Sequence, residues 1–417
     1  MKTSQKVKLG DIAKIKGGKR LPKGFDVQDN ITSHPYIRVT DMDENGLILS
    51  NIKYISDEVF SRIKNYTISS NDIYISIAGT IGRVGIVPDN FLGSNLTENA
   101  AKITKLDKNY NKKFITYFLQ SKYGQGLIKN RIGGTSQPKL PLYRIAEITI
   151  PNLIKEKQDG IVDLIEKYND LIDINRRRVQ LLEESARLLF REWFVYFRFP
   201  GHEKVKIVDG VPEGWRFAKV KDLGQIVTGK TPSKKNIRNF DGNVPFIKTP
   251  DMHQSWIILN TEETLSEIGA SLQNNKYLPP WSVLVSCIGT VGVVAMNLFK
   301  SQTNQQINSV IPKNKFYLYY SFFCLSNIKP LLEAIGGGST MTNINKNKFE
   351  NIKINIPSEN VLAEFYQTVN PIFNQIALLI DQNQKFAQAR DLLLPRLMSG
   401  EIEVSESNIE ISKEAET

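Results

Sequence analysis

The sequence predicts an α+β protein in which two similar strand-rich domains are separated by two long helices that form an antiparallel coiled coil. Three observations support this fold class: the chain is duplicated, each copy holds short β-branched runs, and a heptad pattern follows each copy. The predicted boundaries are 1–152 for the first domain, 153–200 for a central helix, 201–357 for the second domain, 358–402 for a C-terminal helix and 403–417 for an acidic, disordered tail.

The duplication appears as a constant spacing between matching segments. Residues 35–42 match residues 245–252 at an offset of 210. The same offset relates residues 75–82 to residues 285–292. Two copies of so long a unit indicate a duplicated domain and not a solenoid. A protein built in this way is expected to read two similar targets.

Short runs of β-branched and aromatic residues predict the strands of each copy. In the first copy, residues 36–39, 73–77 and 84–87 have this composition, and residues 112–122 show helical spacing. A final alternating segment ends at a proline in both copies, at Pro151 and at Pro357. Each copy is therefore expected to be a compact α+β domain.

After each closing proline, apolar residues recur in alternating steps of four and three, as in a heptad seam. The first seam consists of Ile161, Ile165, Tyr168, Ile172, Asn175, Val179, Leu182, Ala186 and Leu189. The second, 204 positions later, consists of Phe365, Val369, Ile372, Ile376, Leu379, Asn383, Phe386, Arg390 and Leu393. Two such helices, each ~60 Å long for ~40 residues, predict a rod that fixes a distance. Two separate amphipathic helices are the alternative.

Polar residues interrupt both seams. An asparagine in a seam lowers stability but fixes register. If the two helices run antiparallel, we expect Asn175 and Asn383 to face each other.

The net charge is unevenly distributed along the chain. The whole chain carries +11, but residues 401–417 hold six glutamates and one lysine, a net of −5, so the first 400 residues carry +16. A basic body with an acidic tail favours binding to a polyanion such as double-stranded DNA. A lysine-rich surface that only keeps the protein soluble is the alternative.

Composition excludes several other classes of protein. No apolar run approaches the ~20 residues that span a bilayer, and the first residues lack the apolar core of a signal peptide. The two cysteines, Cys287 and Cys324, are too few for a disulfide framework or a thiolate zinc site. The three histidines have no metal-ligand spacing. We expect a cytoplasmic protein with no membrane partner, no metal site and no catalytic group.

One segment matches the phosphate-binding P-loop pattern. Residues 224–231 have its glycines, lysine and threonine at the required spacing. A P-loop also needs a buried strand before it and a helix directly after it. Here Pro232 and a polar stretch follow, and the first copy breaks the spacing, so we do not expect ATP binding at this segment.

Basic residues cluster around the glycines of this segment in both copies, where flexible loops are suited to contact phosphates. The tight turns at 79–82 and 289–292 and the polar loops at 133–139 and 337–343 add side chains that can read bases, because Arg pairs with guanine and Gln or Asn with adenine. Ordinary solvated turns are the alternative. The predicted DNA-binding residues are Lys16, Lys19, Arg20, Arg83, Gln137, Lys139, Lys230, Lys234, Lys235, Arg238, Asn343 and Lys346.

Three segments carry recognisable motifs: residues 214–226 at the start of the second domain, residues 186–195 at the end of the central helix, and residues 389–402 in the C-terminal helix. With these motifs the chain resembles the specificity subunit of type I restriction-modification enzymes, in which they would be the start of a target recognition domain, the end of the central conserved helix and the C-terminal helix. The resemblance covers essentially the whole chain.

This resemblance implies a DNA-reading subunit without catalytic groups. Each domain would read one half of a split, asymmetric site, and the helices would set the gap and dock two methyltransferase subunits, with Trp193 and Phe194 as docking residues. Burial of these two residues against the rod is the alternative. The resemblance places no cofactor in this chain. S-adenosylmethionine would be carried by the methyltransferase subunits, and ATP and Mg²⁺ by restriction (translocase) subunits.

Three alternatives stay open at this point. The first is a stand-alone enzyme, such as an adenine methyltransferase or a P-loop ATPase. The second is a dimerising scaffold, and the third is the specificity part of a related two-subunit restriction system. The recognised DNA sequence, the half-site of each domain and the spacer length are not readable from the sequence.

Overall fold

The computed structural model describes residues 6–43, 46–134, 137–336 and 343–402. The predicted disordered tail, residues 403–417, lies outside the described residues. The chain divides into two compact units, residues 1–171 with 385–417, and residues 172–384. Each unit therefore combines one strand-rich domain with part of both long helices. The domain boundaries predicted from the sequence stay predictions.

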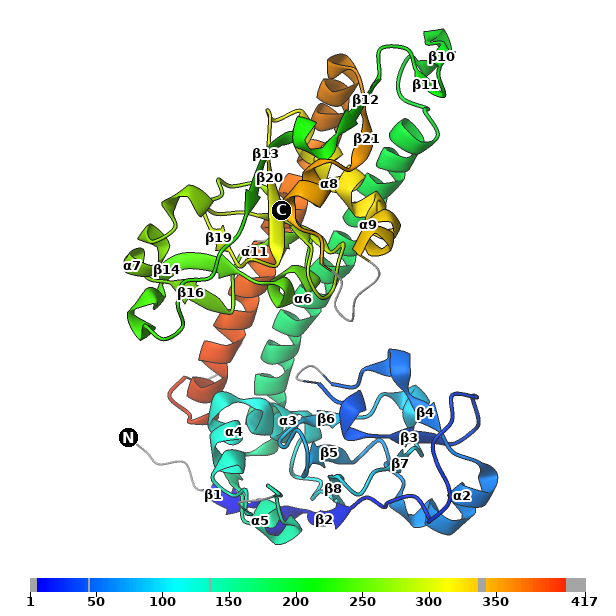
Figure 1. Cartoon of the computed structure of the whole chain (residues 1–417). Helices are drawn as coiled ribbons and strands as arrows, with labels where there is room; N and C mark the ends of the chain where they lie inside the picture. The colour runs from blue at the N-terminus through cyan, green and yellow to red at the C-terminus, as the bar shows by residue number, and fades with distance from the viewer. Residues whose placement is uncertain (1–5, 44–45, 135–136, 337–342, 403–417) are drawn as a thin grey trace. The chain divides into compact units, whose positions relative to one another are not determined.

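The first unit begins with a strand that pairs with the last strand of its domain. Figure 1 draws the strands of this unit in blue and cyan. Its strands are β1 (Lys6–Lys8), β2 (Lys14–Gly17), β3 (Pro35–Ile37), β4 (Lys53–Tyr54), β5 (Ile73–Ser76), β6 (Val84–Ile86), β7 (Asn95–Leu96), β8 (Ala100–Thr104) and β9 (Thr149–Pro151). Its helices are α1 (Leu9–Ile12), α2 (Asp57–Ile63), α3 (Lys112–Gln120), α4 (Lys122–Lys129), α5 (Leu142–Ala146) and the first part of α6 (Lys155–Phe190), with short 3-10 helices at Val39–Asp41, Leu49–Asn51, Lys64–Tyr66 and Asp89–Phe91.

The second unit repeats this order. Its strands are β10 (Ile207–Val208), β11 (Val211–Pro212), β12 (Arg216–Lys219), β13 (Gly224–Thr228), β14 (Phe240–Ile247), β15 (Ile257–Ile258), β16 (Glu263–Leu265), β17 (Val283–Ser286), β18 (Val294–Asn297), β19 (Gln302–Thr303), β20 (Ile307–Pro312) and β21 (Lys353–Ile356). Its helices are α7 (Glu267–Ser271), α8 (Tyr317–Asn327), α9 (Lys329–Gly336), α10 (Lys346–Glu350) and the first part of α11 (Glu359–Met398), a π-helix at Arg191–Val195 and 3-10 helices at His202–Lys204, Val220–Asp222, Ile237–Asn239, Thr249–His253 and Asn274–Lys276.

Sheet topology shows the duplication directly. The first unit has sheets of order β2-β8-β5-β6 and β4-β3-β7, and the second has β13-β20-β17-β18-β15 and β16-β14-β19. The antiparallel pair β1-β9 corresponds to the pair β12-β21. Apart from the additional strand β15 and the hairpin β10-β11, the two units share one strand order.

Apolar side chains at the predicted spacing bury the long helices against their own domains. In the first unit, Ile161 and Ile165 of α6 and Leu397 of α11 join a core with Phe114 of α3 and Ile75 of β5. All five side chains are less than 5% exposed. The core thus joins the sheet to the helices within one unit.

An aromatic cluster does the same in the second unit. Phe365 of α11 is fully buried, with ring centroids 4.7 Å from Phe194 and 5.5 Å from Trp193. Phe190 and Tyr320 pack in the same core. Burying an aromatic ring removes a large apolar area from water, so this cluster fixes the end of α6 against α8 and α11.

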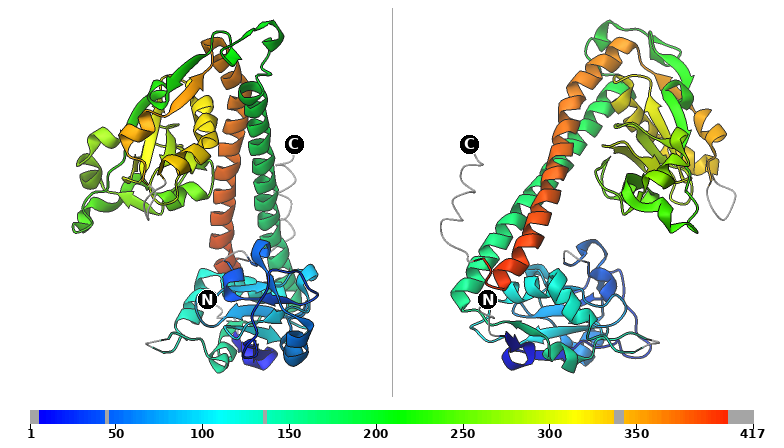
Figure 2. Two further views of the ribbon diagram at one scale, coloured as in Figure 1. Left: turned by 45° about the vertical axis from the view of Figure 1, so that its right-hand side comes forward. Right: turned by 90° about the vertical axis from the view of Figure 1, so that its left-hand side faces the viewer.

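The helices run antiparallel in each unit, as predicted. In the second unit they lie side by side (Figure 2), and Asn175 faces Gln382 while Trp193 faces Phe365, so positions advance in opposite directions. In the first unit, Asn169 accepts a hydrogen bond of 2.8 Å from the Arg390 guanidinium. Arg390 interrupts the sequence pattern but is satisfied in this way.

The predicted pairing of Asn175 with Asn383 is wrong in detail. Asn175 donates to the Gln382 side chain at 3.4 Å, and Asn383 donates to the backbone carbonyl of Ile172 at 3.1 Å. Both amides reach across the seam, and Asn175 is only 5% exposed. The two asparagine side chains do not meet, because Asn175 bonds to the residue before Asn383 and Asn383 bonds to a residue one turn before Asn175.

Candidate nucleic-acid interface

In the first unit, the predicted basic and glycine-rich segments come from one edge of the four-stranded sheet. Strands β2 and β5 end at this edge and β8 and β6 begin there, because neighbouring strands are antiparallel. We call this the loop edge. In the first unit it consists of residues 18–20, 77–83, 97–99 and 137–140.

Backbone hydrogen bonds fix the first unit's loop edge. The Gly18 N–H donates to the Ala100 carbonyl at 2.9 Å, and the Lys19 N–H donates to the Leu96 carbonyl at 2.8 Å. The Leu140 N–H donates to the Ile77 carbonyl at 2.9 Å, which brings the segment after residue 136 to the same edge.

The second unit repeats each of these bonds. Gly229 donates to the Ile307 carbonyl at 3.1 Å, Lys230 to the Thr303 carbonyl at 2.9 Å, and Ile344 to the Cys287 carbonyl at 2.9 Å. Its loop edge consists of residues 229–231, 287–293, 304–306 and 343–344. The two edges therefore have the same backbone frame.

Glycine is required at one matching position of each edge. A Cβ atom on Gly18 would lie 2.1 Å from the Thr97 carbonyl oxygen, and one on Gly229 would lie 2.1 Å from the Asn304 carbonyl oxygen. Backbone atoms cannot yield at such distances, so both sites need a residue without a side chain.

The turns between β5 and β6 and between β17 and β18 confirm the structural interpretation of their glycines. Gly79 and Gly82 have φ angles of +73° and +94°, and Gly289 and Gly292 have +76° and +81°. Residues that carry a side chain rarely adopt such φ angles. Beneath the first turn, the Ser76 hydroxyl accepts the Arg83 N–H at 2.8 Å.

Several of the predicted DNA-binding residues lie together at the two edges. In the first unit, Lys19 and Arg20 follow β2 after Gly18, and the exposed Gln137 and Lys139 lie on the segment beside Ala78. In the second unit, Lys230 follows β13 after Gly229, and Asn343 pairs with Ile288.

Arg83 and Lys346 complete the set at or near the edges. Arg83 begins the exit from its turn and is partly buried. Lys346 is exposed at the start of α10, three residues after Asn343.

Lys16 lies apart from the loop edge. It is exposed on β2 and, with Asn65, Tyr66 and Lys102, lines a small pocket of about 340 Å³. Lys19 of the loop edge places its ammonium 5.5 Å from the centre of the Tyr66 ring. Positive charge therefore extends from this pocket to the loop edge.

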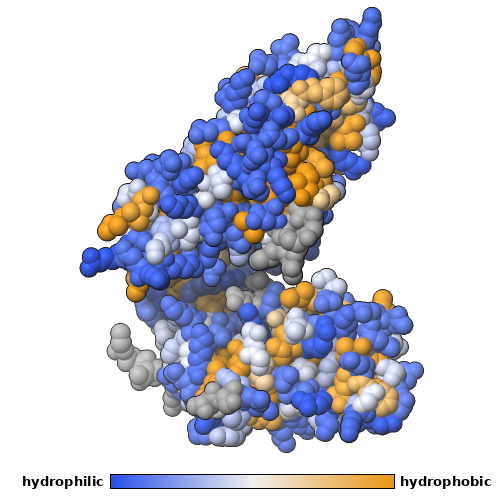
Figure 3. Space-filling view, in the orientation of Figure 1, coloured by the Kyte–Doolittle hydropathy of each residue, from blue (hydrophilic) through white to orange (hydrophobic). Residues whose placement is uncertain are grey.

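The remaining predicted basic residues of the second unit follow its loop edge along the chain. Lys234 forms an ion pair of 3.7 Å with Glu263 of β16, and Lys235 and Arg238 are exposed between β13 and β14. Polar residues cover most of the visible surface around β14, β16 and α7 (Figure 3). These three cations all lie on the segment between β13 and β14.

Sequence reasoning missed the pair of hydrogen-bonded side chains that crosses each loop edge. Arg20 donates from Nε to Glu98 at 2.7 Å, and Thr231 donates to Gln305 at 2.5 Å. The duplication carried a signal for these pairs, because their members occupy matching positions in the two copies. Arg20 and Thr231 are 211 positions apart, and Glu98 and Gln305 are 207 apart.

The predicted docking residues are core residues. Trp193 and Phe194 are 7% and 9% exposed and pack on Phe365. Side chains with so little accessible surface cannot supply a docking face without a rearrangement of the core. The structure supports the burial interpretation and gives no support to the docking role of these two residues.

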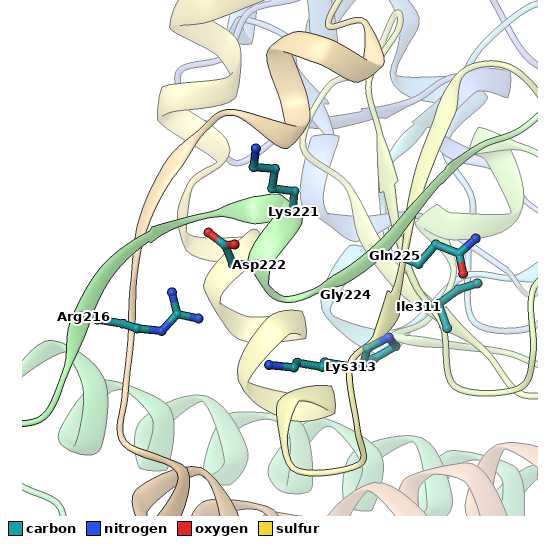
Figure 4. A pocket seen from close by; sticks show the side chains of 8 residues that line it. Arg216, Lys221, Asp222, Gly224, Gln225, Ile311 and Lys313 are labelled. Atoms are coloured by element: carbon teal, nitrogen blue, oxygen red, sulfur yellow. The ribbon is translucent and has the colours of Figure 1, made fainter.

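The P-loop-like segment has the wrong local structure for phosphate binding. Its first five residues form strand β13, paired antiparallel with β20, and the next helical element is the short 3-10 helix Ile237–Asn239. Gly224 lines a pocket of about 470 Å³ in which Arg216 and Lys313 point towards each other (Figure 4). The Asp222 carboxylate in this pocket accepts the Lys219 N–H.

No group of three His, Cys, Asp or Glu side chains within the described ranges lies close enough to hold a metal ion. Among these same residues, every helix is too short or too polar to cross a membrane.

Comparison with known proteins identifies the family. A family model described as the type I restriction modification DNA specificity domain matches residues 1–184 and 212–385. The chain belongs to this family. The match covers the strand-rich domains of both units, in agreement with the duplicated fold.

Individual relatives agree over most of their length. The chain is 31% identical to the type I restriction enzyme HindI specificity subunit of Haemophilus influenzae, covering 94% of this chain and 98% of the relative. It is 24% identical to the MjaIX specificity subunit of Methanocaldococcus jannaschii, covering 70% and 69%. A crystal structure of a type I S subunit from M. genitalium shares the fold, with a TM-score of 0.55 at 14% identity over 94% of this chain and 96% of that one.

Proposed function

We propose that this chain selects the DNA sequence for a type I restriction-modification complex, with each strand-rich domain binding one half of a bipartite site on double-stranded DNA. The observation that carries the proposal is the repeated loop edge: the same hydrogen-bonded frame occurs twice, each time with lysines and polar side chains exposed on it. Two equivalent frames with different side chains are suited to two different half-sites.

The chemistry of the edge fits a nucleic acid better than a small molecule. Lys19 and Lys230 are exposed beside the strand ends, where an ammonium group can neutralise a phosphate. Arg83, Gln137 and Asn343 are of the types that pair with guanine or adenine in the major groove. Phosphate contacts position the protein and base contacts select the sequence.

The direct test is to co-express the chain with the methyltransferase subunit of its system and map methylated adenines in the host genome. We expect one motif with two specified blocks and an unread gap. Replacing residues 6–152 by another recognition domain should change one block only. A motif without two blocks, or a change in both blocks, would contradict the proposal.

The enzyme alternatives predict a different result for the purified chain. Binding of S-adenosylmethionine, or hydrolysis of ATP, by this chain alone would favour a stand-alone enzyme. Under our proposal these cofactors and Mg²⁺ belong to the methyltransferase and restriction subunits.

For the docking of a methyltransferase subunit, an exposed stripe on α6 replaces the buried Trp193 and Phe194. Ile174, Leu181 and Leu188 are seven residues apart and are 53%, 69% and 46% exposed. They lie on the same face of the helix, away from the seam. The duplication repeats the pattern, because Leu378 of α11, the counterpart of Ile174, is 49% exposed.

A single substitution tests this stripe. Leu181→Asp places a charge on its most exposed residue, so the fold should be unaffected while docking of an apolar helix face weakens by tenfold or more, about 1.4 kcal/mol. The matched control, Gln180→Asp, adds the same charge to an exposed neighbour outside the stripe. Equal subunit affinity for both variants, measured by titration calorimetry, would rule out this docking face.

Helix length is proposed to set the unread gap. Adding four residues to α6 and four to α11 lengthens each by ~6 Å, which corresponds to nearly two base pairs at ~3.4 Å each. We expect a longer gap with unchanged half-sites. An unchanged gap in the methylation motif would contradict this part of the proposal.

A further inference from the structure

A pair of side chains crosses the loop edge at the same place in both units, but the pairs differ chemically. In the first unit the Arg20 guanidinium donates to the Glu98 carboxylate at 2.7 Å. In the second unit the Thr231 hydroxyl donates to the Gln305 side-chain carbonyl at 2.5 Å.

Backbone hydrogen bonds establish that the two pairs occupy equivalent positions. The residues before Arg20 and Thr231 are held by the matching bonds of Gly18 and Gly229. The residue before Glu98, Thr97, donates its N–H to the Ile37 carbonyl at 3.0 Å. The residue before Gln305, Asn304, donates to the Ile247 carbonyl at 3.1 Å, and Ile37 and Ile247 are themselves counterparts.

Packing does not explain the difference between the pairs. The Arg20 side chain is 79% exposed and Gln305 is also exposed. An ion pair so open to water contributes little to stability. The buried residues around both pairs hold the same backbone course, so the exchange of side chains is not needed to keep the fold.

The pair does, however, orient its members. Burial acts to raise the pKa of the Glu98 carboxyl, but hydrogen bonds from Arg20, its own backbone N–H and Thr97 outweigh burial, and the pKa lies below its usual value. The carboxylate is therefore charged at neutral pH and holds Arg20 by Nε, which leaves the two Nη groups as donors. In the second unit, Gln305 keeps its amide donors and one carbonyl lone pair.

We propose that these pairs are specificity determinants: Arg20, positioned by Glu98, reads a G·C pair, and Gln305, positioned by Thr231, reads an A·T pair at the corresponding place of the other half-site. Arg donates two hydrogen bonds to guanine O6 and N7, and Gln both accepts from and donates to adenine N6 and N7. This inference rests on the proposed function of the chain.

The duplication supplies the experiment. The double variant Arg20→Thr with Glu98→Gln places the second unit's pair in the first unit's frame, and Thr231→Arg with Gln305→Glu does the reverse. Each full-length variant is co-expressed with the methyltransferase subunit, methylated motifs are mapped, and binding to duplexes randomised at single positions is measured.

The first exchange should move the preference at one base pair of one half-site from G·C to A·T, changing the ratio of affinities by about tenfold or more. The second should produce the opposite change in the other half-site. All remaining positions should keep their bases. Gln305→Ala, an exposed truncation that needs no repacking, should relax discrimination at one base pair.

Three outcomes would overturn the inference. The first is an unchanged motif in both exchanges. The second is loss of binding to every sequence by variants that melt like the parent. The third, which decides the matter if both exchanges unfold, is unchanged discrimination in Gln305→Ala. Failure of the parent complex to give a bipartite motif would instead contradict the proposed function.

Discussion

The two domains have sheets of the same strand order, but different polar residues are buried in them. In the first, the buried Asp72 carboxylate accepts hydrogen bonds from the Lys102 ammonium at 3.0 Å and from the Ser69 N–H at 2.9 Å. In the second, the counterparts of Asp72 and Lys102 are Ser282 and Ser309, both fully buried.

A local backbone difference accompanies this exchange. Ser69 corresponds to Pro279, which has no N–H to donate to a carboxylate. Ser282 instead donates its hydroxyl to the Pro279 carbonyl at 2.8 Å. The comparison shows that strand pairing and the matching glycines fix the frame, while buried polar groups only have to find partners within it. Side chains on that frame are therefore free to diverge.

The largest expected effect comes from breaking the ion pair of the first domain. Lys102→Met leaves Asp72 buried without its cation, and removing one member of such a pair costs about 3–5 kcal/mol. Amide exchange should accelerate in β5 and β8 but not in β17 and β20. The matched control is Ser309→Ala, which should change stability little because, among the residues the structure describes, none hydrogen-bonds to the Ser309 hydroxyl. Unaltered exchange in Lys102→Met would contradict the importance of the pair.

A smaller effect is expected where the two long helices differ beside their seams. Glu183 of α6 corresponds to Ala387 of α11. Burial, only partly offset by Arg187, raises the pKa of Glu183 to about 7. The folded state thus favours the protonated carboxyl, so stability is highest at low pH and falls as pH rises from the unfolded pKa, about 4.3, towards 7.

Glu183→Gln removes this loss. Because the side chain is partly exposed and screened by water, we expect the variant to be more stable than the parent by about 1 kcal/mol at pH 8, with the gap closing near pH 4. Denaturation midpoints at both pH values measure it. Glu184→Gln, which removes the same charge from an exposed neighbouring site paired with Arg187, is the control for loss of a glutamate on this helix. An equal difference at both pH values would contradict the assigned cause.

The smallest effect concerns single phosphate contacts on the matching edges. Lys19→Ala and Lys230→Ala should each weaken DNA binding a few-fold, equally for all sequences, and reduce the slope of log affinity against log salt by about 1. Lys8→Ala and Lys353→Ala, exposed on β1 and β21 and outside the loop edges, are the controls. A sequence-dependent loss at Lys19 or Lys230 would show base reading instead of phosphate contact.

Much of the fold could be predicted because the signals are periodic and local. The heptad rows gave α6 and α11, and the glycine turns gave the connections from β5 to β6 and from β17 to β18. The same local reasoning rejected a P-loop at Gly224, but it expected a flexible loop where the structure has strand β13. The roles of Trp193 and Phe194 were harder to predict. The sequence around an aromatic residue at a helix end is the same whether that residue docks a partner or fills a core.

The amino-acid sequence by itself determined the duplication and the two heptad seams, because these depend on spacing along the chain, and its motifs indicated the family by resemblance. Only the tertiary structure decided which polar residues meet. Arg20 and Glu98 are 78 positions apart, and strand pairing alone brings them to 2.7 Å. The same packing pairs Lys234 with Glu263 of β16. Contacts between distant segments depend on how the strands and loops pack, and no local pattern records that packing.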